Sequence, residues 1–139
     1  MFVGEVSEFL VDEIELLLSS VASSHRKFTM RPDKICPSSM RTRRPLIWMR
    51  FHSSQKYTTL ALDIRAALEA FAEKPDDRDP FPHLTLARPG KNPPNPRKLR
   101  FIDSGDAPQL EVERFELWKS ELKPEGAIYT CLKEFELVG

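Results

Sequence analysis

A histidine and a threonine at positions 83 and 85 are the side chains in this sequence best suited to metal-independent chemistry on a phosphate. They lie in residues 81–88, which read as a β-strand. Side chains alternate between the two faces of a strand, so His83 and Thr85 share one face. We expect Leu84 and Leu86, on the opposite face, to be buried against the core.

The chemistry of this pair follows from its two functional groups. An imidazole exchanges protons near neutral pH without help from a metal, and a hydroxyl donates a hydrogen bond to a phosphoryl oxygen. Arg88 and the basic residues after it have the charge to hold a phosphate. A lone His-x-Thr pair is more often a hydrogen-bonded structural histidine, so the spacing alone leaves both interpretations open.

The other histidines and the cysteines do not suggest a metal site. His52 begins a His-Ser-Ser segment of similar shape, but a polar glutamine follows it, and we interpret it as a loop histidine. His25 lies at the polar end of a predicted helix, where a cation is favourable. Cys36 and Cys131 are isolated thiols. We therefore expect no metal and no cofactor.

Composition indicates one globular domain without a strong overall charge. The chain has 139 residues, 40% of them hydrophobic, and its formal net charge is zero, so attraction to a polyanion must come from local patches. Solvated loops are the simpler explanation of the two basic patches, which are Arg41, Arg43, Arg44 and Arg50, then Arg88, Lys91, Arg97, Lys98 and Arg100. No apolar run reaches the length of a membrane span and the N-terminus lacks a signal pattern, so we expect a soluble cytoplasmic protein.

Two helices are predicted from apolar periodicity. The first begins at the capping residue Ser7, has Leu10, Ile14, Leu17, Leu18 and Val21 on one face, and ends before His25. The second covers residues 56–72, with Leu60, Ile64, Leu68 and Phe71 as its buried stripe.

The remaining segments predict strands and loops. We expect strands through residues 28–30, 46–51, 81–88, 110–120 and 128–137, the last two forming a hairpin about a turn at 123–126. A shift in apolar phase between Val112 and Phe115 predicts a bulge. Loops are expected at residues 37–45, at the charged turn 76–79, and around Pro93, Pro94 and Pro96. Helices mixed with an antiparallel hairpin indicate the α+β class.

The segment from Pro82 to Arg88 resembles the second signature of the 2H phosphoesterase superfamily, and in particular its 2′-5′ RNA ligase-like, RNA 2′,3′-cyclic phosphodiesterase family. Further segments resemble the family in the same order along nearly the whole chain. These are Gly4-Glu5-Val6 with the helix after it, residues 46–51, and the closing hairpin with Ser120-Glu121-Leu122, Pro124, Gly126 and Tyr129.

This resemblance implies a bilobal α+β fold and a metal-independent reaction. One histidine acts as general base and another as general acid on an RNA 2′,3′-cyclic phosphate, leaving a 2′-phosphate, and some members catalyse the joining reaction instead. His83 is then the second catalytic histidine, Thr85 orients the phosphate, and Arg88 contacts the anion. RNA ends or small cyclic nucleotides are the implied partners, and Phe81 is placed to stack on a base.

The resemblance is incomplete, because the family's first His-x-Thr motif belongs immediately before residues 2–6. We therefore expect residues 1–139 to be a single domain lacking its N-terminal strand, with impaired chemistry and an open sheet edge that invites a homodimer. A longer natural chain is the favoured account, with a degenerate relative or two complementing chains as alternatives. The rival functions are a non-catalytic RNA-end or nucleotide-binding module and a protein-interaction domain.

Aromatic side chains give a weaker indication of base binding. Trp48, Phe51 and Trp118 have the residue type that stacks on bases, but each occupies a strand position where burial explains it. We expect core positions for most of them. Tyr129 has access to either the cleft or the second sheet face, and its role stays open.

Overall fold

The structure is a computed structural model that describes residues 3–39, 41, 44–73, 78–91, 95, 98 and 101–139. Some of the expectations above concern residues outside these ranges. They are the ones on Phe2, Arg43, Asp76, Asp77, Pro93, Pro94, Pro96, Arg97 and Arg100.

The first helix is α1 (Val11–Ser23), preceded by the 3-10 turn η1 (Glu8–Leu10). Ile14 and Leu18 are buried, as the periodicity predicted, and Ala22, which was not on the predicted face, is buried one turn further on. Two details of the prediction are wrong. Ser7 makes no side-chain cap, because a 3-10 turn follows it and its carbonyl accepts the Leu10 N–H at 3.0 Å. Leu10 and Leu17 stay partly exposed, at 38% and 37%.

The second helix, α2 (Gln55–Ala67), begins where the Ser54 hydroxyl accepts the Tyr57 N–H at 3.4 Å, which is an N-cap bond. It buries Leu60, and Leu68 just beyond its end is also buried. The helix is shorter than predicted, because the chain tightens into the 3-10 turn η2 (Glu69–Phe71). The apolar stripe is nevertheless continuous across this change.

A four-stranded antiparallel sheet has the order β4-β3-β2-β5. Its strands are β2 (Pro32–Pro37), β3 (Ile47–Phe51), β4 (His83–Ala87) and β5 (Ile102–Asp103). The predicted strands at 46–51 and 81–88 are confirmed as β3 and β4. Within the described part of the chain β4 has only β3 as a neighbour, so its other edge is open. Pairing of two chains through that edge stays a prediction.

The other strands are β1 (Phe28–Met30), β6 (Leu110–Val112), β7 (Arg114–Lys123) and β8 (Gly126–Glu136). The predicted hairpin is confirmed as β7 and β8, with Gly126 at φ +138° after the turn. The irregularity expected after Val112 is a change of partner at Glu113. There β6 leaves β1 and β7 begins to pair with β8.

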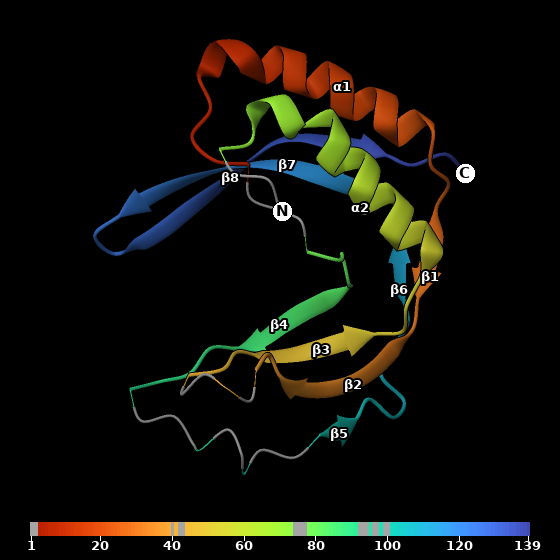
Figure 1. The fold of residues 1–139 in the computed structure, drawn as a ribbon, viewed down its shortest axis with the longest axis vertical. Coiled ribbons are helices and arrows are strands. Elements are labelled where there is room, and N and C mark those ends of the chain that lie inside the picture. The colour runs from red at the N-terminus through yellow and green to blue at the C-terminus, as the bar shows by residue number, and fades with distance from the viewer. Residues whose placement is uncertain are drawn as a thin grey trace.

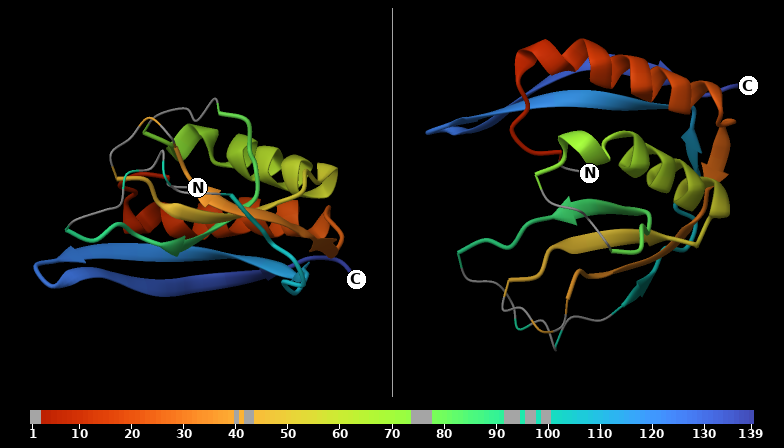
Figure 2. Two further views of the ribbon diagram at one scale, coloured as in Figure 1. Left: turned by 90° about the horizontal axis from the view of Figure 1, so that it is seen from below. Right: turned by 45° about the horizontal axis from the view of Figure 1, so that its top comes forward.

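Figure 1 shows α1 lying over the β7–β8 hairpin in one half of the molecule and the four-stranded sheet in the other. The rotated views keep this arrangement, with α2 beside α1 (Figure 2). One core joins the elements through Ile14, Leu18, Ala22, Phe28, Met30, Phe51, Leu60, Leu68, Phe135 and Leu137. The α+β class with antiparallel sheets and two main helices is confirmed. Neither helix of the described residues is long and apolar enough to cross a membrane.

Candidate active site around His83

Three rings gather at the start of β4. The His83 ring lies 4.2 Å from the Trp48 ring and 5.0 Å from the Phe81 ring, measured between centroids, and the two aromatic rings are 5.6 Å apart. Trp48 comes from β3, which pairs with β4, whereas Phe81 precedes β4 in the chain. The imidazole therefore packs against two side chains from neighbouring segments, while His83 stays exposed.

The hydrogen bond of His83 fixes its tautomer. Nδ1 lies 3.2 Å from the carbonyl oxygen of Phe81, and a carbonyl can only accept, so Nδ1 carries the hydrogen. In the neutral ring Nε2 then has the free lone pair and can take a proton. This geometry suits a general base as well as an acid once that nitrogen is protonated.

Thr85 lies on the same face of β4 as His83, two residues along the strand. In the ladder with β3, Thr85 is opposite Trp48 and His83 is opposite Arg50, and directly opposed residues share a face. The structure therefore places Thr85 and His83 on one face of β4, with Phe81 against the imidazole, and the roles of these residues stay predictions.

Two further neighbours of His83 are Trp48 and Arg50. The sequence left Trp48 between a base-stacking role and a core position, and it favoured a solvated basic loop for Arg50. The Arg50 guanidinium carbon actually lies 5.2 Å from the centre of the Phe81 ring, within cation–π distance. The sequence contains a signal for this placement. Trp48 and Arg50 are two residues apart, so they share a face of β3, and antiparallel pairing of β3 with β4 puts that face beside the His83 motif.

The expected burial of Leu84 and Leu86 is wrong. Their exposed fractions are 54% and 45%, so their face of β4 is open. β4 is an edge strand. None of its residues, all of which the structure describes, belongs to the buried core. Alternation sets which side chains share a face, but it does not decide whether anything covers that face.

Arg88 lies one residue past the end of β4 and is exposed. Its guanidinium makes no ion pair within the described ranges, so its charge is available to solvent and ligands. Arg44, from the first basic patch, donates to the carbonyl of Gly90 at 2.8 Å and so links the loop before β3 to the loop after β4. The role of Arg88 as an anion contact stays a prediction.

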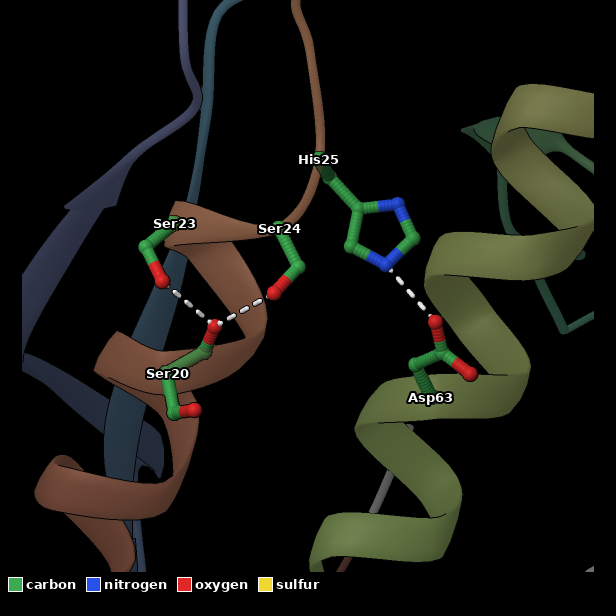
Figure 3. Close-up of polar contacts among 5 residues, drawn as sticks. All are labelled: Ser20, Ser23, Ser24, His25 and Asp63. Atoms are coloured by element: carbon green, nitrogen blue, oxygen red, sulfur yellow. Dashed lines mark hydrogen bonds and ion pairs between the residues drawn. The ribbon is translucent and has the colours of Figure 1, made fainter.

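His25 is tied to the second helix, away from this cluster. Its Nε2 lies 2.8 Å from Oδ2 of Asp63 on α2 (Figure 3), and only 12% of its side chain is exposed. Figure 3 also shows the last turn of α1, where the Ser23 and Ser24 hydroxyls donate to the carbonyl of Ser20. His25 therefore joins the end of α1 to α2, which explains its position without any catalytic role.

Replacing His25 by alanine should lower the free energy of unfolding by about 1 kcal/mol, the usual net value of an intramolecular hydrogen bond. The loss is limited because Asp63 is 53% exposed and water can reach it. Urea denaturation measures the effect, with the exposed His52→Ala variant as the matched control, expected within about 0.5 kcal/mol of the parent. Equal midpoints for the two variants would contradict a structural role for the His25–Asp63 contact.

His52 lies just after β3 in an exposed loop, as interpreted from the sequence. Its backbone N–H donates to the carbonyl of Arg31 at 2.9 Å. In the described structure no hydrogen bond or ring contact joins its side chain to His83. Of the three histidines in the chain, His83 alone belongs to the aromatic cluster.

Neither cysteine is among the residues that the structure shows in contact with His83. Cys36 is buried, and desolvation together with Glu116 and Glu134 raises the pKa of Cys131, which keeps that thiol protonated. Among the described residues no group of three or more His, Cys, Asp or Glu side chains has the arrangement to hold a metal ion.

The remaining aromatic residues divide between core and surface. Phe51 is buried, as expected, whereas Trp118 is 51% exposed and donates its indole N–H to Glu116 at 2.9 Å. Trp118 is therefore an exception to the core positions expected for most of these residues, because the hairpin face on which it lies is open. Tyr129 is opposite Ser120 in the hairpin and is exposed.

Comparison with known proteins identifies a family for this fold and motif. The profile of the family described as LigT-like phosphoesterases matches residues 52–129, which include the whole His83 motif. An RNA 2′,3′-cyclic phosphodiesterase of Archaeoglobus fulgidus is 31% identical over 137 residues, covering 98% of this chain and 76% of that protein. One of Thermus thermophilus is 36% identical over 101 residues, covering 68% of this chain but only 48% of that protein, about half its length.

Solved structures agree in fold. A crystal structure of a Thermus thermophilus protein superposes with a TM-score of 0.79 at 28% identity, over all of this chain and 76% of that one. E. coli LigT in its apo form gives a TM-score of 0.76 at 24% identity, over all of this chain and 74% of that one, which supports the fold alone. The chain therefore belongs to the LigT-like phosphoesterase family of the 2H superfamily.

Proposed function

We propose that this chain is an RNA 2′,3′-cyclic phosphodiesterase-type phosphoesterase whose chemistry centres on His83. The observation that carries the proposal is the oriented imidazole, whose Nδ1 is hydrogen-bonded to the Phe81 carbonyl and whose Nε2 has no hydrogen-bond partner among the described residues, beside Thr85 on the same face of β4. The names of the Archaeoglobus and Thermus relatives supply the substrate class.

In the proposed reaction water attacks the phosphorus of the cyclic phosphate. The bond from phosphorus to the 3′-oxygen breaks, that oxygen takes a proton, and a 2′-phosphate remains. One group must remove a proton from water and another must protonate the 3′-oxygen. His83 Nε2 fills one of these roles, Thr85 donates to a phosphoryl oxygen, Arg88 balances the charge, and Phe81 stacks on the base.

A second proton-transfer group is missing from the described cluster around His83. His25 is bonded to Asp63, and His52 has no described contact with His83. Hydrolysis by this chain alone should therefore be slow, by about 10²- to 10⁴-fold relative to a site with both groups. The same observation favours a second candidate function, a module that binds RNA ends or nucleotides without catalysis.

Hydrolysis of 2′,3′-cyclic AMP by this chain in the presence of EDTA tests the proposal. Phosphorus NMR distinguishes a 2′-phosphate product from a 3′-phosphate. Formation of the 2′-phosphate above the uncatalysed rate supports the phosphodiesterase. Binding of adenosine 2′-monophosphate without turnover supports the binding module, and the absence of both removes both functions.

A further inference from the structure

We infer that Arg50 is a phosphate-binding residue of the site around His83. The inference builds on the proposed function, because RNA-end phosphates are its expected ligands. Arg50 lies inside the cluster of rings, whereas Arg88, the arginine indicated by the motif, lies past the end of the strand.

The position of Arg50 is set by strand pairing and by a ring contact. It is directly opposite His83 in the β3–β4 ladder, and opposed side chains have Cβ atoms about 4.5–5.5 Å apart. Its guanidinium carbon is 5.2 Å from the centre of the Phe81 ring, which itself lies 5.0 Å from the His83 ring. An oxyanion in contact with the imidazole is therefore within reach of the guanidinium.

Among the described residues, no carboxylate neutralises the charge of Arg50. Its Nε is buried without a hydrogen-bond partner in that part of the chain. Arg114 on β7, in contrast, is an arginine whose charge is paired with carboxylates. Its Nε lies 3.1 Å from Glu116 and 3.3 Å from Glu134, and these contacts raise the pKa of the guanidinium.

A second cation lies on the other side of Arg50. Lys34 of β2 is directly opposite Arg50, so the three strands present His83, Arg50 and Lys34 in one row. Like charges directly opposed across strands are destabilising, and an anion bound in the row offsets that repulsion. Lys34 already has Asp33 at 3.7 Å, which leaves Arg50 as the cation of this row without a carboxylate partner among the described residues.

Arginine suits this place better than lysine. A planar guanidinium stacks on an aromatic ring and presents donors that fit two oxygens of a phosphate, whereas an ammonium is a strongly hydrated point charge. Phe81 supplies that stacking surface here. Arg50→Lys therefore keeps the charge and removes both the stacking and the paired donors, which separates these contributions in a binding experiment.

The test is calorimetric titration of this chain with adenosine 2′-monophosphate and, separately, with inorganic phosphate. Arg50→Gln should weaken both affinities by about 10- to 100-fold, the usual effect of a lost charge-assisted hydrogen bond. Arg50→Lys should have an intermediate effect, and Arg114→Gln is the matched control that should leave both affinities unchanged. The Nε–H signal of Arg50 in the nitrogen NMR spectrum of the parent chain should shift on addition of phosphate, whether or not the glutamine variant folds.

The outcomes distinguish this inference from the proposed function. Equal affinities of the parent chain and Arg50→Gln overturn the role of Arg50, even when the parent hydrolyses 2′,3′-cyclic AMP. An Arg50-dependent phosphate affinity in a chain without hydrolysis supports the phosphate site and removes the proposed activity. A parent chain that binds neither ligand, with an unmoved Arg50 signal, overturns the phosphate site.

Discussion

Replacing His83 by alanine should lower kcat for 2′,3′-cyclic AMP hydrolysis by about 10²- to 10⁴-fold, the usual effect of losing a positioned acid or base. The imidazole is the one group of the described cluster that transfers protons near neutral pH, since Thr85 and Arg50 do not. The measurement is the initial rate in EDTA at saturating substrate, so that kcat and KM are obtained separately. A fall in kcat with little change in KM is the expected pattern, because the proton is transferred only in the transition state.

The matched control for this prediction is His52→Ala. Both histidines are exposed and lie in or next to strands of the same sheet, but of the two only His83 packs against Trp48, in a tilted arrangement, and is hydrogen-bonded to the Phe81 carbonyl. His52→Ala should therefore retain the parental kcat. A large loss in this variant would identify His52 as the second proton-transfer group, and an unchanged rate in His83→Ala would exclude His83 from the reaction.

The secondary structure near the motif could be predicted because local patterns determine it. The strands at 46–51 and 81–88 have apolar runs ended by prolines or polar residues, and both exist as β3 and β4. β2 was missed, since Pro32 and Pro37 at its ends and the charged Asp33 and Lys34 inside it are typical of a loop. It forms because β3 and β5 pair with its two edges, a long-range contact that a local pattern cannot reveal.

The site was predicted only in part for the same reason. Alternation within one strand correctly placed His83 and Thr85 on a common face. The neighbours that give the site its charge and its stacking surface, Arg50 and Trp48, come from another strand and depend on the register between β3 and β4. Exposure of Leu84 is likewise a property of the whole sheet, because it depends on what packs against an edge strand.

The largest expected effect on stability comes from Phe135. Its side chain is 3% exposed in the core, and its ring lies 5.0 Å from that of Phe115 in a stacked arrangement with an angle of 18° between planes. Truncation of a buried phenylalanine to alanine removes its burial and leaves a cavity, at a cost of about 3–5 kcal/mol. Domains of this size are typically stable by only about 5–15 kcal/mol, so Phe135→Ala should remove much of the total.

The matched control is Phe9→Ala, the same substitution at an exposed phenylalanine. Phe9 lies in the turn η1 with 95% of its side chain exposed, so Phe9→Ala should change the free energy of unfolding by no more than about 0.5 kcal/mol. Urea denaturation of both variants compares the midpoints at equal slope, which isolates the loss of core packing from any change in the denatured state. Phe135 is on β8, which lies under α1, and the core joins these two elements to β3 beside the His83 site. Equal midpoints would contradict a contribution of Phe135 to the core, whereas a much lower midpoint for Phe135→Ala is the result expected if β8 contributes to the core that also contains Phe51 of β3.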